Sequence, residues 1–325
     1  VGEESFEEGK IIMSAMAITA LQETNFTWLG SRYQGKVRDS YVRNDERVLI
    51  ATDRLSAFDR VLTTVPGKGQ VLTQMAKYWF ERTQSIISNH LIAIPDPCVM
   101  IARDIEIIPV EVVVRGFIAG SAWRDYVAGR PTSGVRLPLG LKEFEQLPRP
   151  VVTPYTKEAV GQHDMPISEA DILSRGIVES RIWEEMKECA LRLFTIASTE
   201  LSQRGLVFAD TKYEFGLLNG RLVLADEIHT LDSSRFWIRE TYEECLAQGR
   251  APEMLDKEPI RRWLLERGFS GDGVPPSIPD EYRRDLAEHY LKSFSRVTGT
   301  SWQMDTRPPL ARVEANLRHY YGLGS

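Results

Sequence analysis

The chain has 325 residues, which is long for one small hydrophobic core and predicts either two lobes or one large mixed unit. Lysine and arginine number 40 against 46 aspartate and glutamate residues, so the formal net charge is −6. This balance argues against a general nucleic-acid binder, because phosphate contacts require a basic surface. With 42% hydrophobic and 26% charged residues, the composition also excludes a wholly disordered or fibrous chain.

The cysteines and the apolar segments indicate the compartment. Cys98, Cys189 and Cys245 are widely spaced and odd in number, so they predict neither a disulfide framework nor a C-x-x-C metal site. The closest approach to a membrane span, residues 11–21, is shorter than the ~20 residues that a bilayer requires. Glutamates precede it where a signal peptide needs positive charge. We therefore expect a cytoplasmic protein without a membrane partner, and we treat residues 1–26 as an N-terminal extension, in part an expression tag.

Residues 27–108 are predicted to form a β-rich N-terminal lobe. β-branched residues are concentrated at 47–52 and again at 110–114, as is typical of strands. Between these two segments, the apolar residues of 73–87 recur at helical spacing and predict an amphipathic helix.

Residues 109–325 are predicted to form a C-terminal lobe of mixed structure. Glycine and proline are frequent over 129–166, which predicts a long irregular excursion of the kind that usually has a function. Apolar residues at three- and four-residue steps predict a helix over 180–201, and helices are also expected over 260–267 and 281–296. Regular βαβ units are missing, so the sequence predicts an α+β protein of two lobes with antiparallel sheets and flanking helices.

The common signatures of nucleotide, metal and hydrolase sites are absent from the sequence. Gly67-Lys68-Gly69 lacks the first glycine and the hydroxyl residue of a phosphate-binding P-loop, and neither H-E-x-x-H nor G-x-S-x-G occurs. The five histidines are scattered, which disfavours a histidine metal site. The chemistry must therefore rest on carboxylates, lysines, arginines and backbone amides.

The first candidate cluster is a glycine turn with two cations, Gly35-Lys36-Val37-Arg38-Asp39. Such a turn offers backbone N–H groups and positive charge to a phosphate chain. The alternative is an ordinary hairpin with a solvated basic tip.

The second cluster lies at the end of an apolar strand. Arg115 closes this strand, and Ser121 follows two glycines. An arginine in this position clamps a carboxylate or phosphate with two hydrogen bonds. The alternative is a structural arginine paired with a buried carboxylate.

The third cluster is an acidic hairpin that runs from Asp210 through the turn Asn219-Gly220 to Asp226-Glu227. Mg²⁺ needs only one or two carboxylates in addition to phosphate oxygens, so Glu214 and Asp226 are the candidate ligands if they share a face.

The register of the hairpin decides this question. A two-residue loop sets Glu214 opposite Ala225 and sends Asp226 to the other face. A three-residue loop, 218–220, pairs Leu217 with Arg221 and places Lys212, Glu214 and Asp226 together. Because Gly220 suits the left-handed third position of such a loop, we predict the three-residue, bulged turn.

The fourth cluster is Asp232-Ser233-Ser234-Arg235. Hydroxyls beside an arginine suit a phosphorylated ligand. A helix N-cap is the alternative, because aspartate and serine are preferred there.

Taken together, these clusters resemble the SAICAR synthetase family, the phosphoribosylaminoimidazole-succinocarboxamide synthases of purine biosynthesis. The resemblance extends from about residue 27 to residue 302 and is to the longer, single-function form. It rests on segments that occur in family order: 35–39, 51–59, 113–123, 210–216, and 224–227 followed by 232–235. Segments 153–157 and 161–164 are similar to the family's mobile loop.

The resemblance implies an ATP-dependent ligase that joins L-aspartate to the carboxylate of carboxyaminoimidazole ribotide (CAIR). The products are SAICAR, ADP and phosphate, and the reaction passes through an acyl phosphate. The implied fold resembles kinases and ATP-grasp enzymes, with nucleotide bound by the N-terminal lobe and with the substrate and metal sites in the C-terminal lobe. The implied co-substrate is ATP and the implied cofactor is Mg²⁺, and we expect a monomer or small homo-oligomer that binds no nucleic acid.

The family's roles carry over to matching positions of this sequence. The implied ATP-binding residues are Gly35, Lys36, Val37, Arg38, Ile108 and Glu111. Asp210 and Lys212 are implied as catalytic, and Glu214 and Asp226 as Mg²⁺ ligands. The implied substrate-binding residues are Ser56, Asp59, Arg115, Ser121, Lys157, Asp232 and Arg235.

Two other functions remain open from the residues alone. A small-molecule kinase or another ATP-dependent carboxylate–amine ligase on the same scaffold would keep Lys212, Glu214 and Asp226 but need no ribotide clamp. A catalytically inert binding module would bind no nucleotide with Mg²⁺.

Overall fold

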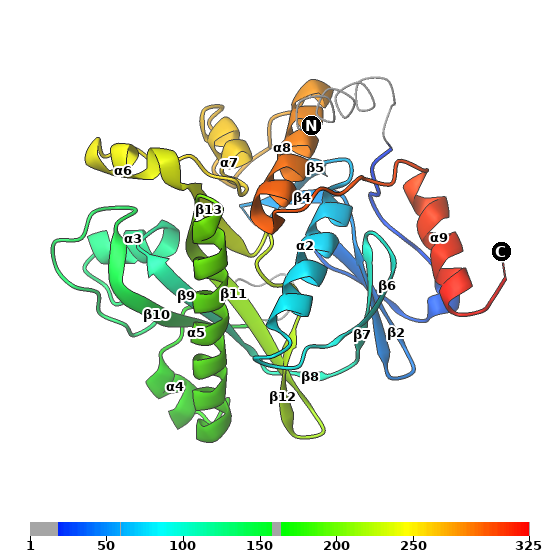
Figure 1. Cartoon of the computed structure of the whole chain (residues 1–325), viewed down its shortest axis with the longest axis horizontal. Coiled ribbons are helices and arrows are strands. Elements are labelled where there is room, and N and C mark those ends of the chain that lie inside the picture. The colour runs from blue at the N-terminus through cyan, green and yellow to red at the C-terminus, as the bar shows by residue number, and fades with distance from the viewer. Residues whose placement is uncertain (1–18, 59, 158–163, 325) are drawn as a thin grey trace.

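The structure, a computed structural model, describes residues 19–58, 60–157 and 164–324. Two antiparallel sheets lie on opposite sides of helix α2 (Lys68–Thr83) (Figure 1). The N-terminal sheet has the strand order β1-β2-β3-β7-β6. Its strands are β1 (Arg32–Gln34), β2 (Arg38–Arg43), β3 (Glu46–Ala51), β6 (Leu91–Asp96) and β7 (Val99–Arg103). A separate hairpin, β4 (Arg54–Ala57) and β5 (Arg60–Thr64), follows β3 in the chain.

The second sheet is built around β11 (Leu206–Leu218), which pairs with four other strands. Its first half lies between β9 and β13, its second half pairs with β12 and β8, and β10 pairs with the far side of β9. These strands are β8 (Glu106–Ile107), β9 (Val110–Phe117), β10 (Gln146–Thr156), β12 (Arg221–Ala225) and β13 (Ser234–Ile238). The backbone of β11 is therefore fixed along both edges, which fixes the positions from which its side chains project.

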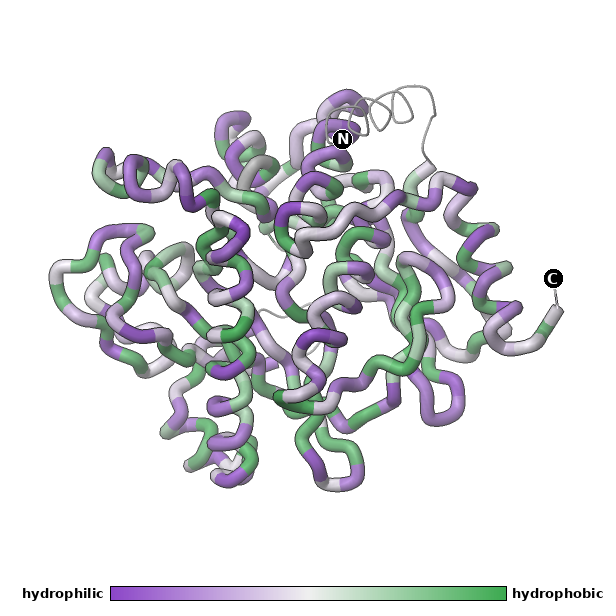
Figure 2. The backbone as a smooth tube through the Cα atoms, in the orientation of Figure 1, coloured by the Kyte–Doolittle hydropathy of each residue, from purple (hydrophilic) through white to green (hydrophobic). Residues whose placement is uncertain are grey.

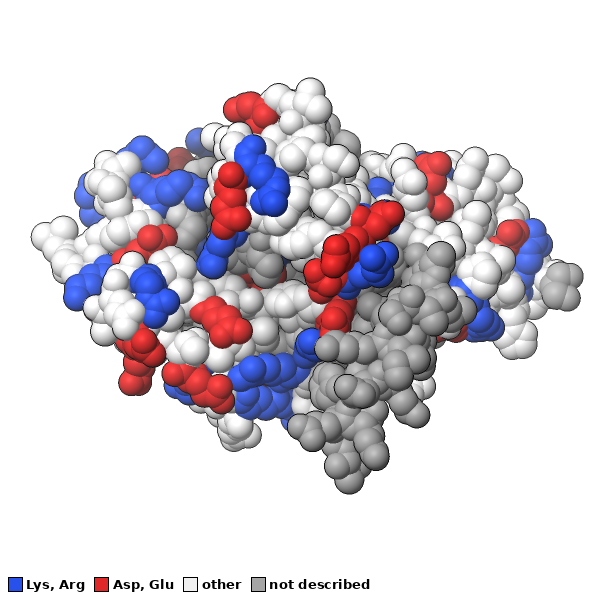
Figure 3. Space-filling model, turned by 90° about the horizontal axis from the view of Figure 1, so that it is seen from above, with Lys and Arg blue, Asp and Glu red and all other residues white. Residues whose placement is uncertain are grey.

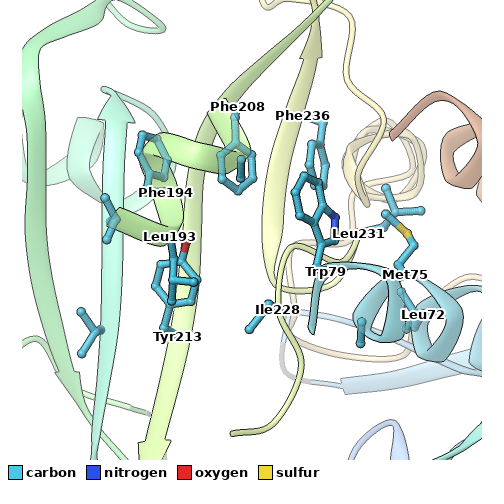
Figure 4. Packing of buried hydrophobic residues seen from close by; sticks show 14 of the residues in the cluster. Leu72, Met75, Trp79, Leu193, Phe194, Phe208, Tyr213, Ile228, Leu231 and Phe236 are labelled. Atoms are coloured by element: carbon cyan, nitrogen blue, oxygen red, sulfur yellow. The ribbon is translucent and has the colours of Figure 1, made fainter. Parts of the chain in front are cut away.

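Helix α5 (Ser180–Gln203) covers one face of the second sheet (Figure 1). Its buried stripe includes Leu193 and Phe194, and the ring of Phe194 stacks on Phe208 of β11 with 5.0 Å between centroids. Trp79 of α2 and Phe236 of β13 belong to the same core cluster (Figure 4). Apolar and polar residues alternate along both α5 and α2, so each helix turns one face to the core (Figure 2). The other helical elements are η1 (Thr27–Leu29), α3 (Gly120–Val127), α4 (Glu169–Ser174), α6 (Arg239–Ala247), α7 (Glu258–Leu265), α8 (Asp280–Thr298) and α9 (Pro309–Tyr320).

The α+β class with antiparallel sheets and flanking helices is confirmed. The helix predicted over 73–87 is α2, which begins earlier and ends at Thr83, and the helix predicted over 180–201 is α5. Residues 47–51 and 110–114 lie in β3 and β9. None of the helices within the described residues is long and apolar enough to cross a membrane.

The irregular excursion predicted over 129–166 is wrong for residues 146–156, which form β10. Three prolines in this strand concealed it, since proline donates no ladder hydrogen bond. β10 is the last strand of the sheet and pairs with one strand, β9, with Val151 opposite Arg115 and Thr156 opposite Val110; on its other side the described residues make only a single bridge, Tyr155 to Pro166. An edge strand tolerates proline where a central strand does not.

The boundaries drawn from the sequence cut through packed regions of the fold. Residues 1–18 lie outside the described part of the chain, but Leu21, Thr24 and Phe26 are buried against the N-terminal sheet, so the end of the 1–26 segment belongs to the core. The largest core cluster also contains residues from both sides of position 108, among them Trp79 and Leu193. The division into 27–108 and 109–325 therefore remains a proposal.

The last helix, α9, is anchored to the N-terminal sheet by a buried ion pair. Arg312 donates from Nε to Asp96 Oδ2 at 2.9 Å and from Nη2 to Asp96 Oδ1 at 3.2 Å. Asn316, one turn later, donates to the same carboxylate at 2.7 Å. The side chains of Arg312 and Asp96 are 1% and 0% exposed, so each needs the other.

Replacement of Arg312 by alanine should lower the free energy of unfolding by about 3–5 kcal/mol, because Asp96 would remain buried without its counter-charge. Urea denaturation measures this change. Arg318→Ala is the matched control on the same helix, because Arg318 makes a half-exposed pair with Glu314 and its loss should cost about 0.5 kcal/mol or less. Similar losses for the two variants would contradict the assigned anchor.

Candidate active site

The floor of the site is one face of the β10-β9-β11 sheet, because alternate residues of a strand point to the same side. β11 presents Asp210, Lys212 and Glu214, and its neighbour β9 presents Glu111 and Arg115. A cavity of about 350 Å³ opens over this face. The predicted site residues that line it are Lys36, Glu111, Arg115, Ser121, Asp210, Lys212, Asp232 and Arg235.

At one end of the floor, Asp210 holds two arginines. It lies opposite Arg115 of β9 and opposite Arg235 of β13. Asp210 Oδ2 accepts from Arg115 Nη1 at 3.1 Å and from Arg235 Nη1 at 2.5 Å. Gly120, at φ 58°, leaves room for the Arg235 guanidinium, which would lie 2.6 Å from any Cβ added there. The two guanidiniums are thus held side by side at the cavity wall.

Arg115 is oriented by neutral partners as well. Its Nε donates to Thr153 Oγ1 at 2.9 Å and its Nη2 to Ser121 Oγ at 3.1 Å, and Tyr155 Oη lies 3.1 Å from Ser121 Oγ. Arg115 therefore pairs with a buried carboxylate and also lines the cavity, so the two alternatives given for it above occur together.

The three-residue turn predicted for the β11–β12 hairpin is wrong. Leu218 pairs with Arg221 and Glu214 with Ala225, so the loop is the two residues Asn219 and Gly220. Their φ values of 52° and 74° are both left-handed, as a type I′ turn requires, and this turn matches the twist of the strands.

Asp226 nevertheless reaches the face that carries Glu214. It lies just beyond the end of β12 and has a φ of 62°, so the chain turns there instead of continuing the alternation of the strand. Asp226 Oδ2 lies 3.7 Å from Lys212 Nζ, which lies 2.5 Å from Glu214 Oε1. A backbone turn, rather than the predicted register, brings the acids together.

Lys212 is the central cation of this acidic end. Its Nζ also donates to Glu111 Oε1 at 2.9 Å, and Lys157 pairs with the second oxygen of Glu214. Burial alone would lower the pKa of Lys212, but the negative charges of Glu214 and Glu111 outweigh burial and raise the pKa well above its ordinary value. Lys212 is therefore a permanent positive charge and not a general base at neutral pH.

Arg38 is the counter-charge of Asp226. Arg38 Nη1 lies 2.5 Å from Asp226 Oδ1, and its Nη2 lies 3.5 Å from Glu227 Oε1. Burial would raise the pKa of Asp226, but Arg38 and Lys212 together hold it well below its ordinary value. The Asp226 carboxylate is thus ionised at neutral pH, as a metal ligand must be.

The donor set fits Mg²⁺ that arrives with a nucleotide. Within the described residues no group of three or more His, Cys, Asp or Glu side chains is placed to hold a metal ion. Mg²⁺ is commonly held by one or two carboxylates while phosphate and water oxygens supply the rest, and Glu214 with Asp226 is such a pair.

Asp232 lies at the opposite wall between two lysines. Asp232 Oδ2 pairs with Lys68 Nζ at 2.8 Å and with Lys257 Nζ at 2.9 Å, and Tyr290 donates to Oδ1 at 3.3 Å. Burial would raise the pKa of Asp232, but Lys257 and Lys68 hold it well below its ordinary value. Asp232 anchors the cations of this wall, and its pairing with them leaves Lys257 on the cavity surface.

Several predicted residues lie away from the cavity floor. Ser56 contributes its carbonyl, 3.5 Å from Lys257 Nζ, and Asp59 lies outside the described residues. Ile108 is buried, and its N–H donates to Phe215 O at 2.9 Å. The remaining predicted residues off the cavity lining are Gly35, Val37, Arg38, Lys157, Glu214 and Asp226, of which the last four form the acid–cation cluster beside it.

The cavity lining also contains residues that were not among the predicted site residues, including Tyr155, Thr211, Lys257 and Arg261. Residues 151–156 are rich in β-branched and aromatic residues, as strands are, but Pro154 and the prolines just before this segment concealed the signal. Lys257 and Arg261 are four residues apart at the start of α7 and so lie on one helical face. On the face of the molecule seen in Figure 3, acidic and basic side chains are interspersed rather than gathered into one basic patch.

The fold and site together define an α+β enzyme that binds anionic groups beside a paired-carboxylate centre. The family profile described as "SAICAR synthetase" matches residues 31–276. The chain therefore belongs to the SAICAR synthetase family, as its motifs predicted.

Relatives and solved structures agree with this assignment. The phosphoribosylaminoimidazole-succinocarboxamide synthase of Legionella pneumophila (strain Lens) is 45% identical over 93% of this chain and 99% of its own length. A putative synthase 2 of the same name from Mesorhizobium japonicum is 44% identical over 89% of this chain and 95% of its own.

The SAICAR synthase of Saccharomyces cerevisiae complexed with SAICAR superposes with a TM-score of 0.76 at 29% identity, covering 88% of this chain and 100% of that one. A SAICAR synthetase in complex with ADP superposes with a TM-score of 0.65 at 27% identity, covering 84% and 100% of the two chains. The antiparallel α+β fold is thus that of the family.

The loop that carries Asp226 and Asp232 contains a buried histidine, His229, which should make the free energy of unfolding depend on pH. His229 is fully buried, its Nε2 lies 2.6 Å from Tyr213 Oη, and burial lowers its pKa from 6.5 to about 3. Between these values the unfolded chain binds a proton that the folded chain does not, so stability falls as pH falls through this window. At about pH 5 the loss attributable to His229 is about 2 kcal/mol relative to neutral pH.

Urea unfolding at neutral pH and at about pH 5 measures this effect. In His229→Leu the difference between the free energies of unfolding at these two pH values should shrink by about 2 kcal/mol. His319 is exposed on α9, so His319→Leu should leave the difference unchanged. An undiminished difference in His229→Leu would show that another group carries the pH dependence.

Proposed function

We propose that this cavity is where the chain carries out the ATP-dependent ligation of L-aspartate to the carboxylate of CAIR, which yields SAICAR, ADP and phosphate. The observation that carries the proposal is the order of charges along β11. Asp210 with its two arginines and Glu214 with Asp226 are separated by about 13 Å of strand, and Lys212 stands between them. An anionic substrate and a nucleotide phosphate could thus meet at Lys212.

The acidic end is proposed to receive ATP. Lys36 and Arg38, with the backbone of the 35–38 turn, would contact the phosphates, and the chain between Ile108 and Glu111 would meet the adenine. Glu214 and Asp226 would hold Mg²⁺, which neutralises phosphate charge when it is bound. The phosphates of ATP would then bind the cationic side chains of this cluster, and Mg²⁺ would bind its carboxylates.

The opposite end is proposed to receive the two carboxylate substrates. Arg115 and Arg235 present guanidiniums that suit the ribotide phosphate or carboxylate, with Ser121 as a hydroxyl donor. Lys257 and Arg261 at the far wall supply charge for the carboxylates of aspartate. Ser56 belongs to the hairpin beside this wall, and Asp232 positions Lys257. Asp59, which lies outside the described residues, stays a predicted substrate contact.

In this reaction the protein would contribute mainly by positioning the substrates and neutralising their charges. A carboxylate is a poor electrophile, and transfer of the γ-phosphoryl group of ATP to it gives an acyl phosphate that the aspartate amine can attack, with release of phosphate. Lys212, always protonated, would stabilise the charge that develops on the transferring group. Asp210 would act by orienting both arginines, and Lys157 would help to keep water from the acyl phosphate.

A coupled assay of ADP release tests this function. Release should require ATP, CAIR and L-aspartate together, and the product should be SAICAR. ADP release that needs only ATP, or ATP and CAIR, would instead support a hydrolase or a kinase.

Arg115→Ala should raise the KM for CAIR by at least about tenfold while the KM for ATP changes less than about twofold, because the lost guanidinium lies at the substrate end. Steady-state kinetics with each substrate varied in turn measures both values. Arg130→Ala, which removes an exposed pair with Asp125, serves as the control. A KM for ATP that rises as much as that for CAIR would contradict the division of the cavity.

Asp226→Asn should separate nucleotide binding from the metal. Loss of this carboxylate should raise the Mg²⁺ concentration for half-maximal activity at least about tenfold. By calorimetry, the gain in ADP affinity that Mg²⁺ gives the wild-type enzyme should shrink, while binding in EDTA should not weaken, because Arg38 is then released. Asp171→Asn, at an exposed pair on α4, is the control. An unaltered Mg²⁺ dependence would remove Asp226 from the metal site.

A further inference from the structure

The motif segment 51–59 contains a buried arginine to which neither the sequence analysis nor the proposed function gives a role. Arg54 is 5% exposed, and its guanidinium lies directly behind the Gly35–Val37 turn. Its Nη2 donates to the carbonyl of Gly35 at 2.9 Å, and its Nε donates to the carbonyl of Lys36 at 3.0 Å. One side chain thus holds two consecutive peptide groups of the turn.

The third carbonyl of the turn is held by a neighbour of Arg54. Thr52 donates to Val37 O from its backbone N–H at 3.0 Å and from its hydroxyl Oγ1 at 2.8 Å. The carbonyls of Gly35, Lys36 and Val37 are therefore all bound by Thr52, in the connection between β3 and β4, and by Arg54, the first residue of β4.

The direction of these carbonyls fixes the direction of the following N–H groups. In a planar trans peptide the C=O and the N–H point to opposite sides. Since the carbonyls of Gly35 and Lys36 point at Arg54, the N–H groups of Lys36 and Val37 point away from it. Successive N–H groups on one side of a turn make an anion-binding concavity.

The charge of Arg54 is only partly balanced locally. Its other partners are Gln22 O, at 2.6 Å from Nη1, and Asp39 Oδ1, at 2.8 Å from Nη2. Asp39 is also shared with Arg32, whose Nη2 lies 3.2 Å from Oδ2. A buried guanidinium whose other three acceptors are neutral carbonyls therefore adds positive potential behind the turn.

We infer that Arg54 is a positioning residue for the nucleotide phosphates. It fixes the 35–37 turn with its carbonyls turned inward, so that the N–H groups and the side chain of Lys36 face the ligand. It also ties this turn to the N-terminal segment through Gln22. The inference rests on the proposed function only in taking this turn as the phosphate site.

Titration calorimetry with ADP and Mg²⁺, and separately with SAICAR, tests the inference on the full chain. Arg54→Ala should weaken ADP binding at least about tenfold, because the turn loses the donor that holds two of its peptide groups, while SAICAR affinity changes less than about twofold. Arg54→Lys keeps the charge but cannot hold both carbonyls in the same fork, and it should also weaken ADP binding. Thr52→Val, which removes one hydrogen bond to Val37 O, should have a smaller effect in the same direction.

Rescue and matched controls separate positioning from general damage. Millimolar guanidinium should restore ADP affinity to Arg54→Ala by filling the vacated space, and it should not improve binding by Arg47→Ala. Arg47 lies on the adjoining strand β3 in a partly exposed pair with Asp104, so its removal should leave ADP affinity unchanged. If Arg54→Ala does not fold, as judged by circular dichroism, Arg54→Lys and Thr52→Val still decide the question.

Folded Arg54 variants that bind ADP as tightly as the wild-type chain would overturn the inference and leave the proposed function intact. Failure of the wild-type chain to bind ADP at all would instead overturn the proposed function. Equal weakening of ADP and SAICAR binding in both Arg54 variants would show a general structural role and would also overturn the inference.

Discussion

Charge pairing between distant segments determines how this site is assembled. A carboxylate removed from water needs a cation or several hydrogen bonds, and each central acid here obtains its cation from another element. Asp210 pairs across the sheet with β9 and β13, Asp226 with Arg38 of the N-terminal sheet, and Asp232 with Lys68 of α2 and Lys257 beside α7. The pairs that set the geometry of the cavity are thus also contacts that hold the two sheets and the helices together.

The residues on β11 could be predicted from the sequence because the physics is local. An alternation of Asp210, Lys212 and Glu214 along a strand places them on one face in any fold. The position of Asp226 could not be predicted in the same way. Both turn lengths are compatible with Asn219-Gly220, and neither reveals that Asp226 itself adopts a left-handed φ of 62°. The expected grouping of acids was right although the register used to derive it was wrong.

The sequence also could not predict which distant residues pair with the acids of the site. Nothing near Asp232 indicates that its counter-charges come from residues 68 and 257, because that pairing depends on how α2 and the start of α7 pack. β10 was concealed for a different reason, since its prolines resemble loop residues unless the strand is known to lie at an edge. The motifs identified the family, whereas the walls of the cavity required the fold.

The pairing of Arg38 with Asp226 constrains how ligands enter. A phosphate that bound Arg38 alone would leave the Asp226 carboxylate without its main counter-charge. A divalent cation that bound Asp226 alone would leave the Arg38 guanidinium without its main counter-charge. If both arrived together, Arg38 would exchange the carboxylate for the anion and Asp226 would exchange the guanidinium for the cation, so the local charge would stay balanced. At the proposed site, the internal ion pair would therefore favour a nucleotide that carries its metal over either species by itself. An ion pair that looks like a closed contact would in this sense be the template for a metal–phosphate complex.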